Sequence, residues 1–187
     1  MIFSIFCIDY RFDAMLADFY KNTGSEYNYF ACSTAGAGLC LGYKNYCKTL
    51  CHSCGCDPTN PSIKILKHSV VENLNIALTL KEIEDIYIIN HQDCGAIRAY
   101  LKCSEYPDFG EHRRREIRIN SELLTYATKY MKDKFKSMEK TLGLMDINGT
   151  MAFYSIKDRI WTVKYIGEFN DESGLWYGMK VGDTYAI

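Results

Sequence analysis

Short apolar runs alternate with helix-favouring segments along the first half of the chain. Residues 2–8, 27–33 and 85–90 are apolar runs of strand length. Between them, residues 12–21 and 68–82 place apolar side chains at helical spacing. Strands that alternate with helices build a parallel sheet whose two faces are covered by those helices. The pattern therefore predicts an α/β fold with a mainly parallel central sheet flanked by helices.

The rest of the chain is expected to complete the same domain. A helix should begin near Ala96, and residues 111–141 are charged and helix-favouring. Three further strands are expected at 143–148, 151–156 and 160–166. Residues 167–187 are expected to form a C-terminal extension that is irregular or hairpin-like. The chain has 187 residues and no internal repeat, so a single domain over 1–187 is predicted.

Composition and charge exclude several classes of protein. The chain is 48% hydrophobic and 24% charged, as in soluble globular proteins. No apolar run approaches the roughly 20 residues that a membrane-spanning helix needs. The net charge of −1 gives no reason to expect a nucleic acid or a membrane surface as partner. The N-terminal apolar run has no basic leader and is broken by Asp9 and Arg11, so we expect no signal peptide and a cytoplasmic location.

The nine cysteines are the unusual part of the composition. In a reducing compartment, many cysteines favour metal binding or catalysis over disulfides. Cys7 follows the first predicted strand, and His91 and Cys94 follow the strand at 85–90. The carboxyl ends of parallel strands form the ligand crevice of an open sheet, so these side chains should meet. Two thiolates and one imidazole, with a fourth position open, are the ligand pattern of a catalytic zinc site.

Asp9 and Arg11 lie close to the first of these ligands. They are two residues apart, and in an extended segment their side chains would point the same way and form an ion pair beside Cys7. Arg11 would keep the carboxylate from closing the open metal position. Zinc lowers the pKa of a water molecule bound there to about 7. Gly95 follows Cys94 and permits tight backbone geometry where the loop meets the helix.

Two short motifs contain these residues. Residues 7–11 have the form C-x-D-x-R, and residues 91–95 have the form H-x-x-C-G. Together they resemble the two signatures of the β-class carbonic anhydrases. Residues 30–36 are also similar to the strand and Ala-Gly turn that lie between the signatures in that family. The resemblance extends over 1–102 and, more loosely, over 143–160.

The resemblance implies a fold, an assembly and a metal. The fold would be β-carbonic-anhydrase-like, with a mostly parallel sheet of about four or five strands. A homodimer or a higher homo-oligomer would place the active site at the subunit interface. Zn²⁺ would be held by Cys7, His91 and Cys94, and Asp9 and Arg11 would form the catalytic dyad that gates its open position.

The resemblance also implies an activity, the reversible hydration of CO2 to bicarbonate. Zinc-bound hydroxide would attack CO2, water would displace the bicarbonate, and a proton would pass to buffer. Gly36 and Gly95 would allow close backbone approach to the substrate. Tyr10 and Asn90 stand where the family usually has a small residue and a glycine. Two alternatives stay open: hydrolysis of carbonyl sulfide or carbon disulfide at the same site, and a non-catalytic, zinc-stabilised binding or structural protein.

Residues 40–62 are rich in cysteine and show no clear hydrophobic period, which predicts an insertion within the domain. The spacing of four of its thiols is typical of small zinc sites, in which metal binding supplies folding energy. These four residues are the candidate ligands of a second, structural Zn²⁺: Cys47, Cys51, Cys54 and Cys56. Disulfides formed on purification and plain unligated thiols are the alternatives.

Overall fold

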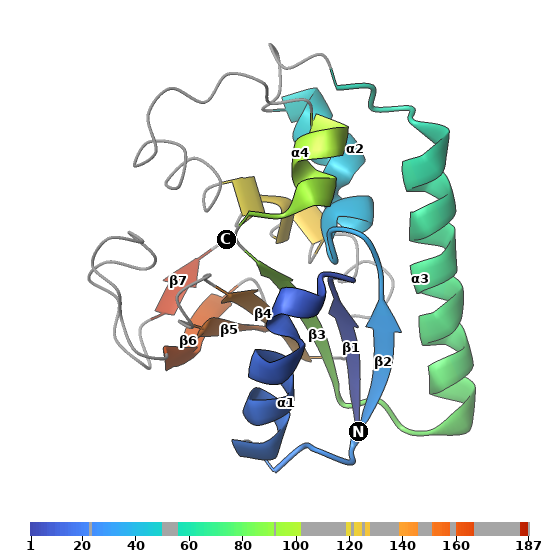
Figure 1. Ribbon diagram of the computed structural model, residues 1–187. Coiled ribbons are helices and arrows are strands. Elements are labelled where there is room, and N and C mark those ends of the chain that lie inside the picture. Colours follow the sequence, from blue (N-terminus) through green and yellow to red (C-terminus); the bar gives the residue numbers. More distant parts are fainter. Residues whose placement is uncertain are drawn as a thin grey trace.

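The computed structural model describes residues 1–22, 24–49, 56–91, 93–101, 119–120, 122–124, 126–127, 139–145, 151–157, 160–166 and 184–186. These residues form a seven-stranded sheet of order β2-β1-β3-β4-β5-β6-β7 (Figure 1). The strands are β1 (Ile2–Phe6), β2 (Tyr29–Ser33), β3 (Asp85–His91), β4 (Glu139–Met145), β5 (Met151–Lys157), β6 (Ile160–Ile166) and β7 (Thr184–Ala186). The helices are η1 (Tyr10–Phe12), α1 (Asp13–Asn22), α2 (Leu39–Thr49), α3 (Pro61–Leu80) and α4 (Gly95–Leu101).

The sheet has a parallel half and an antiparallel half. Strands β2, β1, β3 and β4 pair in parallel, with β1 between β2 and β3. On the other side of β4, strands β5, β6 and β7 follow in that order, and each pairs with the strand before it in an antiparallel manner. The α/β class is therefore confirmed, but the sheet has more strands than the resemblance implied. Its mainly parallel character is limited to the part built from the first four strands.

The two faces of the parallel half are covered by different helices. Phe3 and Ile5 of β1 belong to a core cluster that includes Leu39 of α2 and Leu74 of α3. A second cluster joins Ile89 of β3 to apolar side chains of η1 and α1. Side chains of a strand alternate between the two faces of its sheet. Both faces are covered here, which explains why these strands are continuous apolar runs.

Two parts of the predicted segment without a period, 40–62, are helical among the described residues. Residues Leu39–Thr49 form α2, and α3 begins at Pro61, earlier than predicted. The side chain of Asn60 accepts a hydrogen bond from the backbone N–H of Ser62 and caps that helix. Cys40 and Cys47 lie in the core on α2, where a thiol behaves as a small apolar side chain.

The later part of the chain differs from prediction at one strand. Strand β4 begins at Glu139, inside the segment 111–141 that was expected to be helical. Within that segment, residues 119–120, 122–124 and 126–127 are helical as predicted. Of the expected extension 167–187, the structure describes β7, which pairs with β6 in an antiparallel manner. None of the described helices combines the length and the apolar character needed to cross a membrane.

A glycine in α2 sets how closely that helix approaches the segment around Leu123. A Cβ atom at Gly42 would overlap the backbone carbonyl oxygen of Leu123 and lie 3.2 Å from its carbonyl carbon. Backbone atoms cannot move aside as a flexible side chain can, so Gly42→Ala should lower the free energy of unfolding by about 1–3 kcal/mol. This loss should exceed the helix-propensity gain of about 1 kcal/mol that alanine brings. Urea unfolding followed by circular dichroism measures it.

Gly95→Ala is the matched control for this prediction. A Cβ at Gly95, the first residue of α4, would have no atom of the described residues within 4 Å. Its unfolding free energy should change by about 0.5 kcal/mol or less. Equal stability of Gly42→Ala and the wild type would contradict the close approach.

Candidate metal centre

Three potential metal ligands meet at the carboxyl ends of β1 and β3. Cys7 follows β1 directly, His91 ends β3, and Cys94 immediately precedes α4. Because β1 and β3 are parallel neighbours with Phe6 opposite Ile89, their carboxyl ends lie side by side. The Cys7 and Cys94 Sγ atoms are 3.9 Å apart. The ligand atoms of the three residues all lie within 4.8 Å of one another.

This donor set fits a tetrahedral metal ion. Two thiolates at zinc–sulfur distances of about 2.3 Å would place their sulfur atoms about 3.8 Å apart in a tetrahedral site. The observed separation of 3.9 Å is close to that value. All three side chains are buried, with exposed fractions of 6% for Cys7, 0% for His91 and 1% for Cys94. The group can therefore hold a metal ion with little rearrangement of the chain.

The surroundings favour the thiolate form of Cys7. The Cys94 thiol donates a hydrogen bond to Cys7, and the His91 imidazole adds a second favourable interaction; together they lower the pKa of Cys7 to about 4. The backbone N–H of Gly36 also donates to the Cys7 Sγ, at 3.4 Å. The pKa of Cys94 is raised, because its proton serves the hydrogen bond to Cys7 and because the thiol is buried.

The predicted ion pair between Asp9 and Arg11 is present, but the expected extended geometry is wrong. Asp9 is extended, and residues Tyr10–Phe12 then form the 3-10 helix η1, whose first turn Asp9 caps. This turn brings the Arg11 guanidinium back onto both carboxylate oxygens of Asp9, at 2.9 Å from Oδ1 and 2.6 Å from Oδ2. These hydrogen bonds lower the pKa of Asp9 to about 2. Asp9 Oδ2 lies 3.8 Å from His91 Nε2, at the edge of the donor set.

A second aspartate, which sequence reasoning missed, completes the charge pattern. The Arg11 Nη1 atom donates to Asp93 Oδ2 at 2.9 Å, and Nη2 donates to the Asp93 carbonyl oxygen at 3.0 Å. Arg98 of α4 donates to the other Asp93 carboxylate oxygen. Asp93 has a φ of 56°, in the left-handed region that aspartate and asparagine tolerate better than most residues. Asp93 thus ties the loop between His91 and Cys94 to the Asp9–Arg11 pair.

The sequence held a weak signal for this contact, since Asp93 lies between two predicted ligands. Its partner Arg11 is 82 positions away, and only the pairing of β1 with β3 brings them together. Asn120 was missed for the same reason. Its buried side chain donates to the His91 carbonyl oxygen at 3.2 Å and so fixes the backbone at that ligand.

The two predicted glycines lie beside the ligands. Gly36 has a φ of 75°, and a Cβ there would lie 2.9 Å from Leu39 and 3.3 Å from Ala96. Conformation and space therefore both require glycine, and its N–H reaches Cys7. Gly95 directly follows Cys94 and begins α4. Their predicted contact with substrate stays a prediction.

The predicted second metal site is described only in part. Cys47 lies in the core on α2, and the Cys56 thiol donates to the carbonyl oxygen of Leu101 at 3.1 Å. Cys51 and Cys54 lie outside the described residues. The four-thiolate set therefore stays a prediction.

Comparison with known proteins gives a distant structural likeness. No protein-family model and no curated protein sequence matches the chain. A tetrameric β-carbonic anhydrase from Sordaria macrospora is similar in structure, at 15% identity and a TM-score of 0.39, covering 81% of this chain and 79% of that one. The β-carbonic anhydrase CcaA is similar at 18% identity and a TM-score of 0.38, covering 82% of this chain and 78% of that one. Arguments about function therefore rest on the site itself.

Removal of one thiol should abolish metal binding at this site. We expect the protein, purified in reducing buffer, to hold about one tightly bound zinc ion at these ligands, and Cys94→Ala to lose it. Cys32→Ala is the matched control, because Cys32 is a buried thiol outside the group. Metal content per chain, measured by mass spectrometry after gel filtration, tests both. Full zinc content in Cys94→Ala would contradict the assignment.

Proposed function

We propose that this chain is a zinc-dependent carbonic anhydrase that catalyses the reversible hydration of CO2 to bicarbonate. The observation that carries the proposal is the convergence of Cys7, His91 and Cys94 with the Asp9–Arg11 ion pair at their edge. Zn²⁺ is the metal proposed, because a set of two thiolates and one imidazole suits it. A cytoplasmic homo-oligomer belongs to the same proposal.

Three protein ligands leave one position of a tetrahedral ion for water. A zinc ion held there would act as a Lewis acid and make water nucleophilic near neutral pH, which the hydration of CO2 requires. The surrounding side chains would provide the environment of the ion. Burial of the three ligands excludes bulk solvent from their side of the site. The Phe12 ring, with its centroid 4.3 Å from that of His91, adds an apolar wall beside the imidazole.

The ion pair gives Asp9 its role. Arg11 engages both carboxylate oxygens, so Asp9 stays ionised and is restrained from becoming a fourth ligand. An ionised carboxylate at the edge of the donor set can accept a hydrogen bond from water and orient it toward CO2. Arg11 is in turn fixed by Asp93, so the carboxylate of Asp9 is held in one place.

The charge of Asp9 should matter for turnover and not for metal binding. Asp9→Asn keeps the shape of the side chain but removes the charge that orients water, so the rate of CO2 hydration should fall by about 100-fold or more. Zinc content should stay at the wild-type level. Glu72→Gln, an equal charge change on an exposed position of α3, should leave the rate unchanged. Stopped-flow measurement with a pH indicator follows the reaction.

Two results would overturn the proposal. If zinc-loaded Asp9→Asn hydrated CO2 at the wild-type rate, the proposed role of the Asp9 carboxylate would be ruled out. If the zinc-loaded wild-type protein did not hydrate CO2, the proposed activity would be ruled out. Assays with carbonyl sulfide and carbon disulfide would then distinguish a hydrolase from a binding protein.

Asp93 should act as a positioning residue through Arg11. Asp93→Asn keeps a side chain that tolerates the positive φ but weakens the charged contact to Arg11, so kcat should fall several-fold with zinc content unchanged. In an Asp9→Asn background the same change should have no further effect on kcat, since its action passes through the ion pair. A merely structural role would give additive losses, which this double-mutant cycle would detect.

A further inference from the structure

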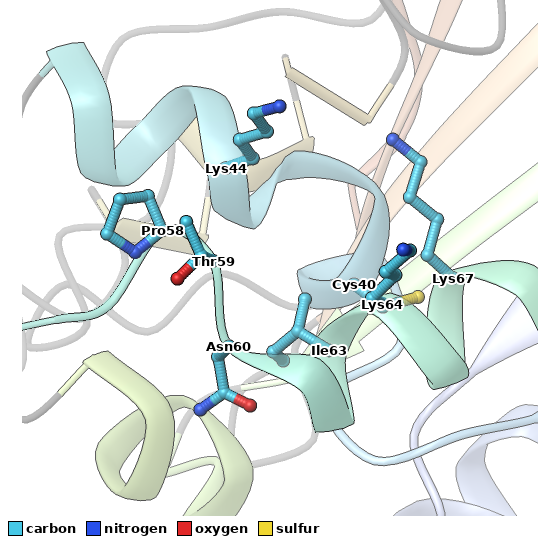
Figure 2. Close-up of a pocket in the computed structure, with 8 residues that line it drawn as sticks. All are labelled: Cys40, Lys44, Pro58, Thr59, Asn60, Ile63, Lys64 and Lys67. Carbon is cyan, nitrogen blue, oxygen red and sulfur yellow. The ribbon is translucent and has the colours of Figure 1, made fainter.

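A hollow lies between α2 and the start of α3, away from the metal centre (Figure 2). Its volume is about 390 Å³, within the range of about 300–1,000 Å³ typical of small-molecule sites. Eight described residues line it: Cys40, Lys44, Pro58, Thr59, Asn60, Ile63, Lys64 and Lys67. None of them belongs to the metal centre or to either sequence motif.

The floor of the hollow is apolar and uncharged. Cys40 and Ile63 are buried there, with exposed fractions of 2% and 5%. The Cys40 thiol donates to the Ala37 carbonyl oxygen at 3.8 Å. Burial raises the pKa of Cys40 to about 12, so the group stays a neutral thiol. The floor therefore carries no negative charge, and the lining of the hollow as a whole offers mostly apolar contact area for an organic group.

The rim of the hollow is strongly cationic. Lys64 and Lys67 are three residues apart on α3 and so share one side of that helix. Lys44 lines the hollow from α2, and Figure 2 shows Lys44 on α2 and Lys67 on α3, each at the border of the hollow. The eight described lining residues include three ammonium groups and no carboxylate. The nearby Asp57 uses its Oδ1 to accept hydrogen bonds from the N–H and the hydroxyl of Thr59.

The positive charges around the hollow favour an anion as its occupant. Burial lowers the pKa of Lys67, and the positive charge of Lys44 lowers it further. An anion bound beside these ammonium groups would interact favourably with their positive charge. The amino-terminal end of α3 also meets the hollow at Asn60, where the helix adds partial positive charge.

We propose that this hollow binds a small phosphorylated molecule, with its phosphate among the three lysines and its organic part on the floor formed by Cys40 and Ile63. Three cations favour an anion of more than one charge over chloride or bicarbonate, because each ammonium can donate to a separate phosphate oxygen. The volume exceeds what one phosphate group needs, which leaves room for an organic substituent. The proposal does not depend on the activity of the metal centre.

Calorimetric titration with two probes tests the proposal. Phenyl phosphate and inorganic phosphate are titrated at equal ionic strength, set with sodium chloride, into the zinc-loaded full chain. Both should bind saturably, and phenyl phosphate should bind more tightly because its ring can contact the apolar floor. Absence of saturable binding of either probe would overturn the proposal. Equal affinity of the two probes would overturn the assignment of the floor.

Charge-matched variants locate the binding. The double variant Lys64→Gln/Lys67→Gln should weaken phenyl phosphate binding by about tenfold or more, since it removes two charged donors. Lys48→Gln/Lys81→Gln removes the same charge at exposed positions outside the hollow and should bind as the wild type does. If phenyl phosphate binding weakened equally in both double variants, the probe would be attracted only by the overall charge of the protein. Unchanged binding in the first variant would place the anion elsewhere, for example at the metal centre. Either result would overturn the proposal.

Discussion

The parallel pairing of β1 with β3 is the constraint from which the geometry of the metal centre follows. Phe6 lies opposite Ile89, so Cys7 and His91 leave the sheet at neighbouring points. A shift of one residue would turn the side chains of β1 to the other face of the sheet. The core resists that shift, because Phe3 and Ile5 face α2 and α3 while Ile89 faces α1. Packing on both faces of the sheet therefore fixes the positions of the ligands.

Ion pairs hold the side chains at the rim of the site, which consists of Asp9, Arg11, Asp93 and Arg98. Arg11 binds the carboxylates of both Asp9 and Asp93, and Arg98 binds the second of these from α4. The two arginines and two aspartates balance in formal charge, so the rim adds no net charge near the metal ligands. A surface ion pair alone contributes little to stability, but a network with bidentate geometry holds its members in place. The proposed catalysis would depend on the orientation that this network gives to the Asp9 carboxylate.

Helix α2 connects the two sites that we propose. The turn before it presents the Gly36 N–H to Cys7, and its first residues pack into the core. Its second residue, Cys40, forms part of the floor of the lysine-lined hollow. Gly42 lets the same helix approach the backbone of Leu123. Within the predicted segment 40–62, Cys40 and Cys47 of α2 thus serve as small apolar side chains in a close-packed interior.

The sequence by itself determined the α/β class, the early strands and the ligand group Cys7, His91 and Cys94, since hydrophobic period and short motifs are local properties of the chain. It also predicted the pairing of Asp9 with Arg11, although the turn that achieves it was not expected. Only the tertiary structure decided the contacts of Asp93 and Asn120 and the gathering of three lysines from two helices. These contacts join residues far apart in the chain, and their partners are set by strand register and helix packing, which no local pattern records.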